Sequence, residues 1–270
     1  MNLDRSFFGA LAFVAFAAPA LAADLPARTY TKAPMVAPVA VYDWTGFYIG
    51  AHGGGAWGNS NWLNTASNGN LGFYPDLLPG DRNGHRISGA LGGGQVGYNF
   101  QSGAFVFGVE LSGSAADVKG SSISQPGPFS LQDDVFTTKI SPLFLASGRV
   151  GYAANNWLLY LKGGYAGASV KTSAVDTAGA TTGAGFARTW HGGWNVGAGV
   201  EYGITPNWSV ALQYDYIQLE TKNVALGGPN FINGVAAGVA IYNWDISPRD
   251  INAVTARINY RFGGPVVARY

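Results

Sequence analysis

The chain has 270 residues, of which 47% are hydrophobic, 14% aromatic and only 11% charged, with a formal net charge of +1. A typical soluble domain has about 25% charged residues, and a nucleic-acid-binding domain is markedly basic, so the composition argues against both classes. The chain has no Cys, which excludes a secreted domain stabilised by disulfides.

The N-terminus has the features of a secretory signal peptide. An apolar run at 7–18 is followed by Pro19 and by Ala20-Leu21-Ala22, a small-residue cleavage site. The run is shorter than the roughly 20 residues of a membrane-spanning helix, so export with cleavage after Ala22 is favoured over an anchor. We therefore expect a signal peptide at 1–22, a Pro/Ala-rich periplasmic linker at 23–43 and a folded domain at 44–270.

Eight segments of the folded domain alternate between apolar and polar residues, the pattern of strands with one apolar and one polar face. In 208–220, Trp208 and Leu212 lie on one face, and Gln213 and Asp215 lie on the other. Aromatic residues gather near segment ends, where membrane-interface residues belong: Trp57, Phe100, Trp157, Trp190, Tyr202 and Trp208. The segments are 46–57, 87–100, 104–115, 139–152, 157–170, 190–203, 208–220 and 250–262.

Short and long connections alternate between these segments. Turn-forming residues at 101–103, 154–156 and 205–207 make three short connections, whereas 59–86, 118–138, 171–189 and 221–249 make four long ones. Short periplasmic turns and long extracellular loops are the layout of an outer-membrane barrel, and lipid tolerates only a closed sheet. The sequence therefore predicts an all-β, eight-stranded antiparallel transmembrane β-barrel of the outer-membrane type with four long extracellular loops.

Seven charged residues fall on the polar faces of these segments and should point into the lumen. An eight-stranded barrel is only wide enough for side chains to fill it, and buried charges must be paired. We therefore predict an ion-pair network in a wet lumen; the alternative is a gated narrow pore. The residues are Glu110, Arg149, Lys162, Glu201, Asp215, Arg257 and Arg261.

The sequence motifs that could indicate a cofactor, metal or catalytic site match their patterns only weakly. A G-x-G-x-x-G match at 92–97 lies inside a strand pattern rather than before a helix, so it predicts curvature and lumen space instead of a dinucleotide site. His52 should face the lumen, His85 falls in the first long loop, and His191 lies at the outer rim. Their spacing does not match a metal site, and a haem or metal role for His85 or His191 is the lesser alternative. We expect no cofactor, no metal and no catalysis.

Two motifs resemble a known family. The chain reads YDWTGFYIG at 42–50 and RINYRF at 257–262, with ADLP directly after the predicted cleavage site. These resemble the small alphaproteobacterial outer-membrane β-barrel family, the outer-membrane immunogenic protein or porin-opacity type. The resemblance implies an eight-stranded barrel with surface-exposed loops and a role in envelope integrity. Some members are described as haem-binding or adhesive, and no ligand residue can be carried over.

The predicted function is that of a structural outer-membrane protein that supports the envelope and presents its loops. The alternative is a narrow porin or a haem- or ligand-binding receptor. Expected partners are outer-membrane lipids and lipopolysaccharide, and the barrel-assembly machinery through the C-terminal strand. A host-surface or haem ligand at the loops is a further candidate. The aromatic residue that the assembly machinery would read is either Phe262 or Tyr270, since the chain continues past Phe262.

Overall fold

The computed structural model describes residues 42–67, 79–124, 134–176, 181–232 and 235–263, all within one compact unit, Ala40–Tyr270. The predicted signal peptide at 1–22, nearly all of the linker at 23–43, and Tyr270 lie outside the described residues. Within the described part of the chain, no helix is both long enough and apolar enough to cross a membrane.

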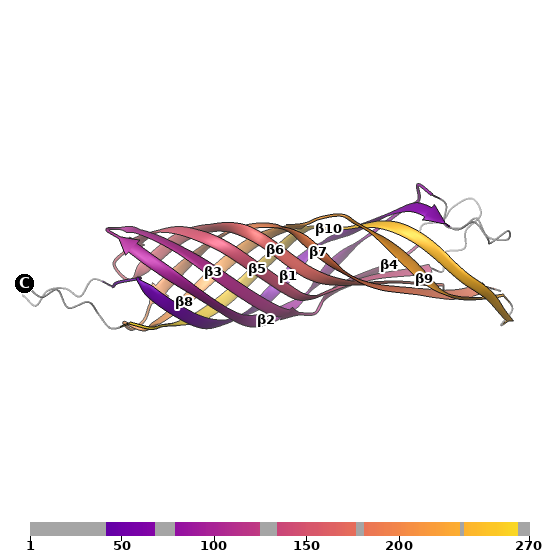
Figure 1. Cartoon of the computed structure of the whole chain (residues 1–270). Helices are drawn as coiled ribbons and strands as arrows, with labels where there is room; N and C mark the ends of the chain where they lie inside the picture. The colour runs from indigo at the N-terminus through magenta and orange to yellow at the C-terminus, as the bar shows by residue number, and fades with distance from the viewer. Residues whose placement is uncertain (1–41, 68–78, 125–133, 177–180, 233–234, 264–270) are drawn as a thin grey trace, which may run out of the picture. The chain divides into compact units, whose positions relative to one another are not determined.

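Ten strands form a single antiparallel sheet (Figure 1). β3 and β4 are two pieces of one barrel strand that is interrupted at Asp117, and β8 and β9 are likewise two pieces of another, since each piece pairs with the same two neighbours. The strands are β1 (Gly46–Ser67), β2 (Arg82–Ser102), β3 (Phe105–Ala116), β4 (Val118–Ile123), β5 (Asp134–Ala154), β6 (Trp157–Asp176), β7 (Thr181–Gly203), β8 (Trp208–Leu219), β9 (Lys222–Ile232) and β10 (Val235–Arg261).

The sheet closes on itself, which confirms the eight-stranded barrel. β1 pairs with β2 on one side and with β10 on the other, where the register runs from Tyr48 opposite Arg261 to Ser67 opposite Tyr242. Each remaining barrel strand pairs with its neighbours in chain order. The eight barrel strands therefore form a ring without a free edge, the arrangement that satisfies backbone hydrogen bonds in lipid.

Side chains alternate between an apolar outer face and a buried interior. Leu161, Leu159 and Val109 on the outer face are 63–65% exposed, whereas the intervening residues are buried. Aromatic pairs mark the end with the short turns, with ring centroids 4.7 Å apart for Trp157 and Tyr202. A second group of exposed aromatic residues bounds the apolar face toward the other end of the strands: Trp57, Phe144, Tyr165, Trp190 and Trp194. These two belts delimit the membrane-spanning part.

The strands continue well past the second belt, so most of the residues predicted as long loops are strand. We call the following parts the strand extension: 59–67, 82–86, 118–123, 134–140, 171–176, 181–189, 222–232 and 235–249. Its interior holds a cluster of buried residues, namely Trp62, Phe136, Val224, Leu226, Trp244 and Ile246. This second core explains why the strands stay paired beyond the second belt, because their inward faces still have apolar surface to bury.

Large tyrosines in the interior lie against glycines of neighbouring strands. The Tyr48 ring occupies the space that a Cβ would take at Gly97, and the Tyr160 ring does the same at Gly199. A larger residue at either glycine would overlap the ring. Part of the high glycine content therefore provides room for bulky side chains in a narrow barrel.

Candidate functional site in the barrel interior

The interior is filled by layers that succeed one another along the barrel. The first layer, at the end with the short turns, is a cluster of Tyr42, Trp44, Val106, Leu158 and Tyr160. A layer of buried charges follows, then an apolar layer, and finally the core of the strand extension. Because the lumen is the only route through a closed barrel, these layers decide what the barrel can transport.

Glu110 is the centre of the charged layer. Its carboxylate accepts hydrogen bonds from Lys162 Nζ at 3.0 Å, from Arg257 Nη2 at 3.0 Å and from the Tyr48 hydroxyl at 2.8 Å. Arg149 lies 3.8 Å from the same carboxylate. The side chains of Glu110 and Lys162 are 2% and 1% exposed, so these charges are shielded from water.

Two further acids complete the charged layer. Arg149 donates to Glu201 at 3.0 Å, and Lys162 lies 3.7 Å from Asp215. The charged layer thus consists of three carboxylates and three cationic side chains: Glu110, Glu201, Asp215, Arg149, Lys162 and Arg257. Its formal charge is zero, which is the condition for burying ions without an uncompensated charge.

Arg261, the seventh residue predicted for the network, lies apart from it. Its guanidinium donates to the backbone carbonyls of Thr45, at 3.1 Å, and Pro206, and it lies over the Tyr42 ring at 5.0 Å. The strand register places Arg261 at the barrel rim, beside carbonyl groups of the neighbouring turn. It therefore closes the short-turn end and leaves the charged layer balanced.

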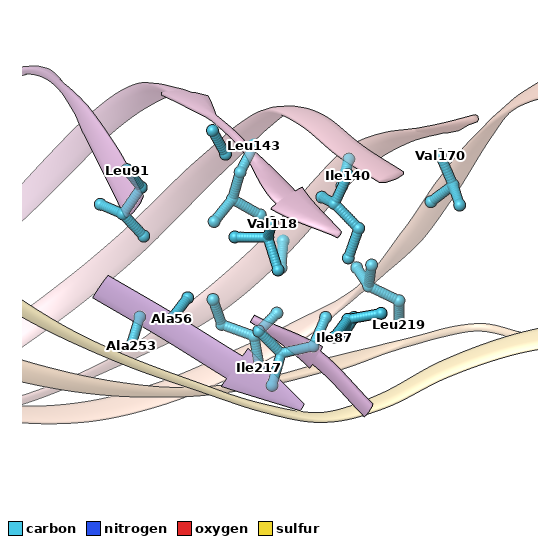
Figure 2. Close-up of a cluster of buried hydrophobic side chains, with 14 of the residues drawn as sticks. Ala56, Ile87, Leu91, Val118, Ile140, Leu143, Val170, Ile217, Leu219 and Ala253 are labelled. Carbon is cyan, nitrogen blue, oxygen red and sulfur yellow. The ribbon is translucent and has the colours of Figure 1, made fainter. Parts of the chain in front are cut away.

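An apolar plug, not predicted from the sequence, lies beyond the charged layer (Figure 2). Its residues are Ala56, Ile87, Leu91, Ala116, Val118, Ile140, Leu143, Leu145, Ala166, Ala168, Val170, Ile217, Leu219, Ile251 and Ala253. Only polar side chains were predicted to fill the lumen, so this apolar layer is a difference from the sequence-based expectation. Several of these residues lie where both faces of a strand are apolar, so alternation alone does not mark them as inward-facing.

The contact between the charged layer and the apolar plug leaves little free space. A cavity of about 20 Å³ there is lined by residues of both layers, including His52, Leu143 and Asp215. That volume is of the order needed for a single water molecule. The side chains that line this cavity therefore leave room for about one water molecule between the two layers.

The three histidines are strand residues with both ring nitrogens in hydrogen bonds. His85 lies in β2, not in a loop, and bonds Ser122 at 3.2 Å and Thr138 at 2.9 Å. Burial lowers the pKa of His85 to about 4, so its ring is neutral. His191 is buried in β7 and bonds a hydroxyl and a backbone carbonyl, and His52 bonds Gln95 and Ser114. Among the described residues, no three potential ligands group around a metal site.

Comparison with known proteins identifies the family. The family model described as "Outer membrane protein beta-barrel domain" matches residues 8–262. The chain belongs to this outer-membrane β-barrel family. The 31 kDa outer-membrane immunogenic protein of Brucella melitensis biotype 1 is 30% identical and covers 92% of this chain and 95% of its own length. The 25 kDa outer-membrane immunogenic protein of Brucella canis is 29% identical over 82% of this chain and 87% of its own length.

Among solved structures, the outer membrane protease OmpT from Escherichia coli matches 80% of this chain and 97% of its own chain at a TM-score of 0.47 and 10% identity. At that distance the likeness carries no information about activity. Membership of the outer-membrane β-barrel family places the protein in the outer membrane. By the layout of such barrels, the end with short turns faces the periplasm and the strand extension is extracellular.

Proposed function

We propose that this barrel is a non-conducting, non-catalytic structural protein of the outer membrane, which supports the envelope and presents its strand extension at the cell surface. The observation that carries the proposal is the pair of seals in series inside the barrel, the charged layer and the apolar plug. Either seal alone would obstruct an ion.

The two seals are closed by different forces. Passage through the charged layer requires separation of buried ion pairs, and the loss of one partner from such a pair costs about 3–5 kcal/mol. Passage through the apolar plug requires an ion to enter a site without polar partners, which is costlier still. A single rearrangement of side chains therefore does not open the lumen. This argues for a permanently closed barrel rather than a gated pore.

The non-catalytic part of the proposal is supported by the interior chemistry. The carboxylates of the charged layer are each bound to cationic partners and shielded from solvent, so a substrate has no access to them. The histidines considered as haem ligands use both ring nitrogens within the wall. Binding of haem iron by His85 or His191 would require these bonds to break.

Single-channel recording in planar bilayers tests the proposal. We expect the refolded wild-type chain, with insertion verified by heat-modifiable gel migration, to give no discrete conductance steps. The matched variant is Ile217→Ser, which introduces a hydroxyl into the apolar plug and leaves the charged layer intact; it should also remain silent. Discrete steps from the wild type would overturn the proposal, and a change in their size in Ile217→Ser would show that the conducting path passes Ile217.

A further inference from the structure

A continuous row of basic residues crosses four strands on the outer face of the barrel. Lys119 in β4 lies opposite Lys139 in β5, Lys139 lies opposite Lys171 in β6, and Lys171 lies opposite Arg188 in β7. Neighbouring strands are about 4.8 Å apart, and like charges directly opposite each other destabilise a sheet. Four cations in register thus have an unfavourable arrangement unless an anion neutralises them.

The basic row faces outward, not into the lumen. The side chains of Lys119 and Lys139 are 61% and 41% exposed, and Lys171 and Arg188 are also exposed. Their chain neighbours Val118, Ile140 and Val170 point the other way, into the apolar plug. Asp117 forms ion pairs with Lys119 at 3.2 Å and Lys139 at 2.6 Å, so these five residues carry four positive charges and one negative charge, a formal charge of +3.

The row lies directly beyond the extracellular aromatic belt. Arg188 is the next outward residue of β7 after Trp190, and its Nε donates to the Ser169 hydroxyl at 2.8 Å, opposite Trp190. Trp190 in turn packs against Phe144, with ring centroids 5.9 Å apart, and donates to the Tyr165 hydroxyl at 3.3 Å. Aromatic belts lie at the headgroup level of a membrane, so the row meets the phosphate-bearing region of the outer leaflet.

A surface groove runs along the same part of the wall. Its volume is about 420 Å³, and its lining includes Lys139, Lys171 and Arg188 together with Thr137, Ser173 and Phe186. Ammonium, guanidinium and hydroxyl groups are the donors that bind phosphate oxygens. On the other side of the barrel, the corresponding outer positions of β10 carry Asn252 and Asp250, which accept hydrogen bonds from Tyr214 and Tyr216. Exposed Arg86 and Arg249 flank Asn59 of β1 and lie outside the row.

We propose that Lys119, Lys139, Lys171 and Arg188 form a binding site for the phosphate groups of a phosphorylated glycolipid of the outer leaflet, the lipid A part of lipopolysaccharide. The aromatic belt below the row contacts the same molecule at the boundary between its headgroup and its acyl chains. The site lies on the outside of the wall, so it does not depend on whether the lumen conducts, and conductance in planar bilayers would leave it untouched.

Titration of the full chain in nonionic detergent with diphosphoryl lipid A tests the site. The variant K139Q/K171Q/R188Q removes three charges, and Arg249→Gln removes an exposed charge on β10 as the matched control. At about 1 kcal/mol per basic residue near an anionic surface, the triple variant should lose affinity by the order of 100-fold, and Arg249→Gln should stay within a few-fold of the wild type. Equal loss in both variants, or none in the triple variant, would overturn the proposal.

Two further binding measurements show whether the site takes lipid-bound phosphate or free phosphate. Dephosphorylated lipid A should bind the wild type as weakly as diphosphoryl lipid A binds the triple variant. Inorganic phosphate at equal concentration should not displace diphosphoryl lipid A; displacement would show a site for free anions and contradict the lipid assignment. The unfolding temperature checks folding: without lipid A the triple variant should unfold at about the same temperature as the wild type, because relief of repulsion along the row offsets the loss of the Lys139–Asp117 ion pair and the Arg188–Ser169 hydrogen bond. A less stable triple variant would contradict the reasoning.

Discussion

Removal of the central carboxylate of the charged layer is the sharpest test of how the interior is held together. Glu110→Gln conserves size but leaves Arg149, Lys162 and Arg257 facing two carboxylates instead of three, a formal charge of +1 in a buried layer. The loss of one partner from a buried ion pair costs about 3–5 kcal/mol. A domain is typically stable by only about 5–15 kcal/mol, so the change should be readily measured.

The charge-balanced double variant isolates the electrostatic part of this cost. Glu110→Gln with Lys162→Met leaves two carboxylates and two guanidinium groups, so we expect it to be more stable than Glu110→Gln alone, with a coupling energy of about 0.5–3 kcal/mol. Asp117→Asn, which breaks the ion pairs of an exposed carboxylate, should cost far less than Glu110→Gln. Urea titrations of the barrel in lipid vesicles, followed by gel migration, measure all of these variants. A Glu110→Gln variant within about 1 kcal/mol of the wild type, or a double variant less stable than Glu110→Gln, would refute the reasoning.

Three further predictions concern the wall and the strand extension. Gly97→Ala should cost about 1–3 kcal/mol because its Cβ overlaps the Tyr48 ring, whereas Gly148→Ala, with open space around it, should leave the unfolding free energy unchanged in the same urea assay. Leu161→Arg on the lipid face should cost about 2–4 kcal/mol for folding into bilayers, but little if that face were in water. The strand extension should lose stability as pH falls from about 6.5 toward 4, because His85 takes up a proton more readily when the extension opens; hydrogen-exchange protection factors at 82–87, which correct for the slower intrinsic exchange at low pH, should fall over that range in the wild type and not in His85→Gln.

The strands of the barrel could be predicted because consecutive residues face lipid and lumen in turn. Lipid-facing positions favour apolar side chains, and lumen-facing positions favour polar ones. In β8, Leu212 faces out and Gln213 and Asp215 face in, as the alternation indicates. The turn-forming residues at 101–103 and 154–156 likewise mark real strand ends. A two-residue alternation with apolar residues on one face strongly indicates a transmembrane β-barrel when it occurs in eight segments of one chain.

The interior layers could not be predicted because they depend on strand register and on height along the barrel. Alternation predicts that Glu110, Lys162 and Arg257 face the lumen, but only the stagger of the strands places them at one level and Arg261 at the rim. The strand extension was missed for a different reason. Its outer face mixes polar residues with exposed apolar ones such as Ile123 and Phe186, so the alternation is unclear there. Its inward residues, such as Trp62 and Trp244, are too widely spaced along the chain to read as one core.

Because the chain has no native Cys, a single introduced thiol can report on the sealed interior directly. Ala253 lies in the apolar plug and is 3% exposed, whereas Ser102 lies exposed at a short turn. In the folded barrel, a water-soluble maleimide should label Ala253→Cys far more slowly than Ser102→Cys, and the two rates should converge in urea. Equal labelling rates in the folded state would mean that water reaches the plug and would contradict the closed lumen.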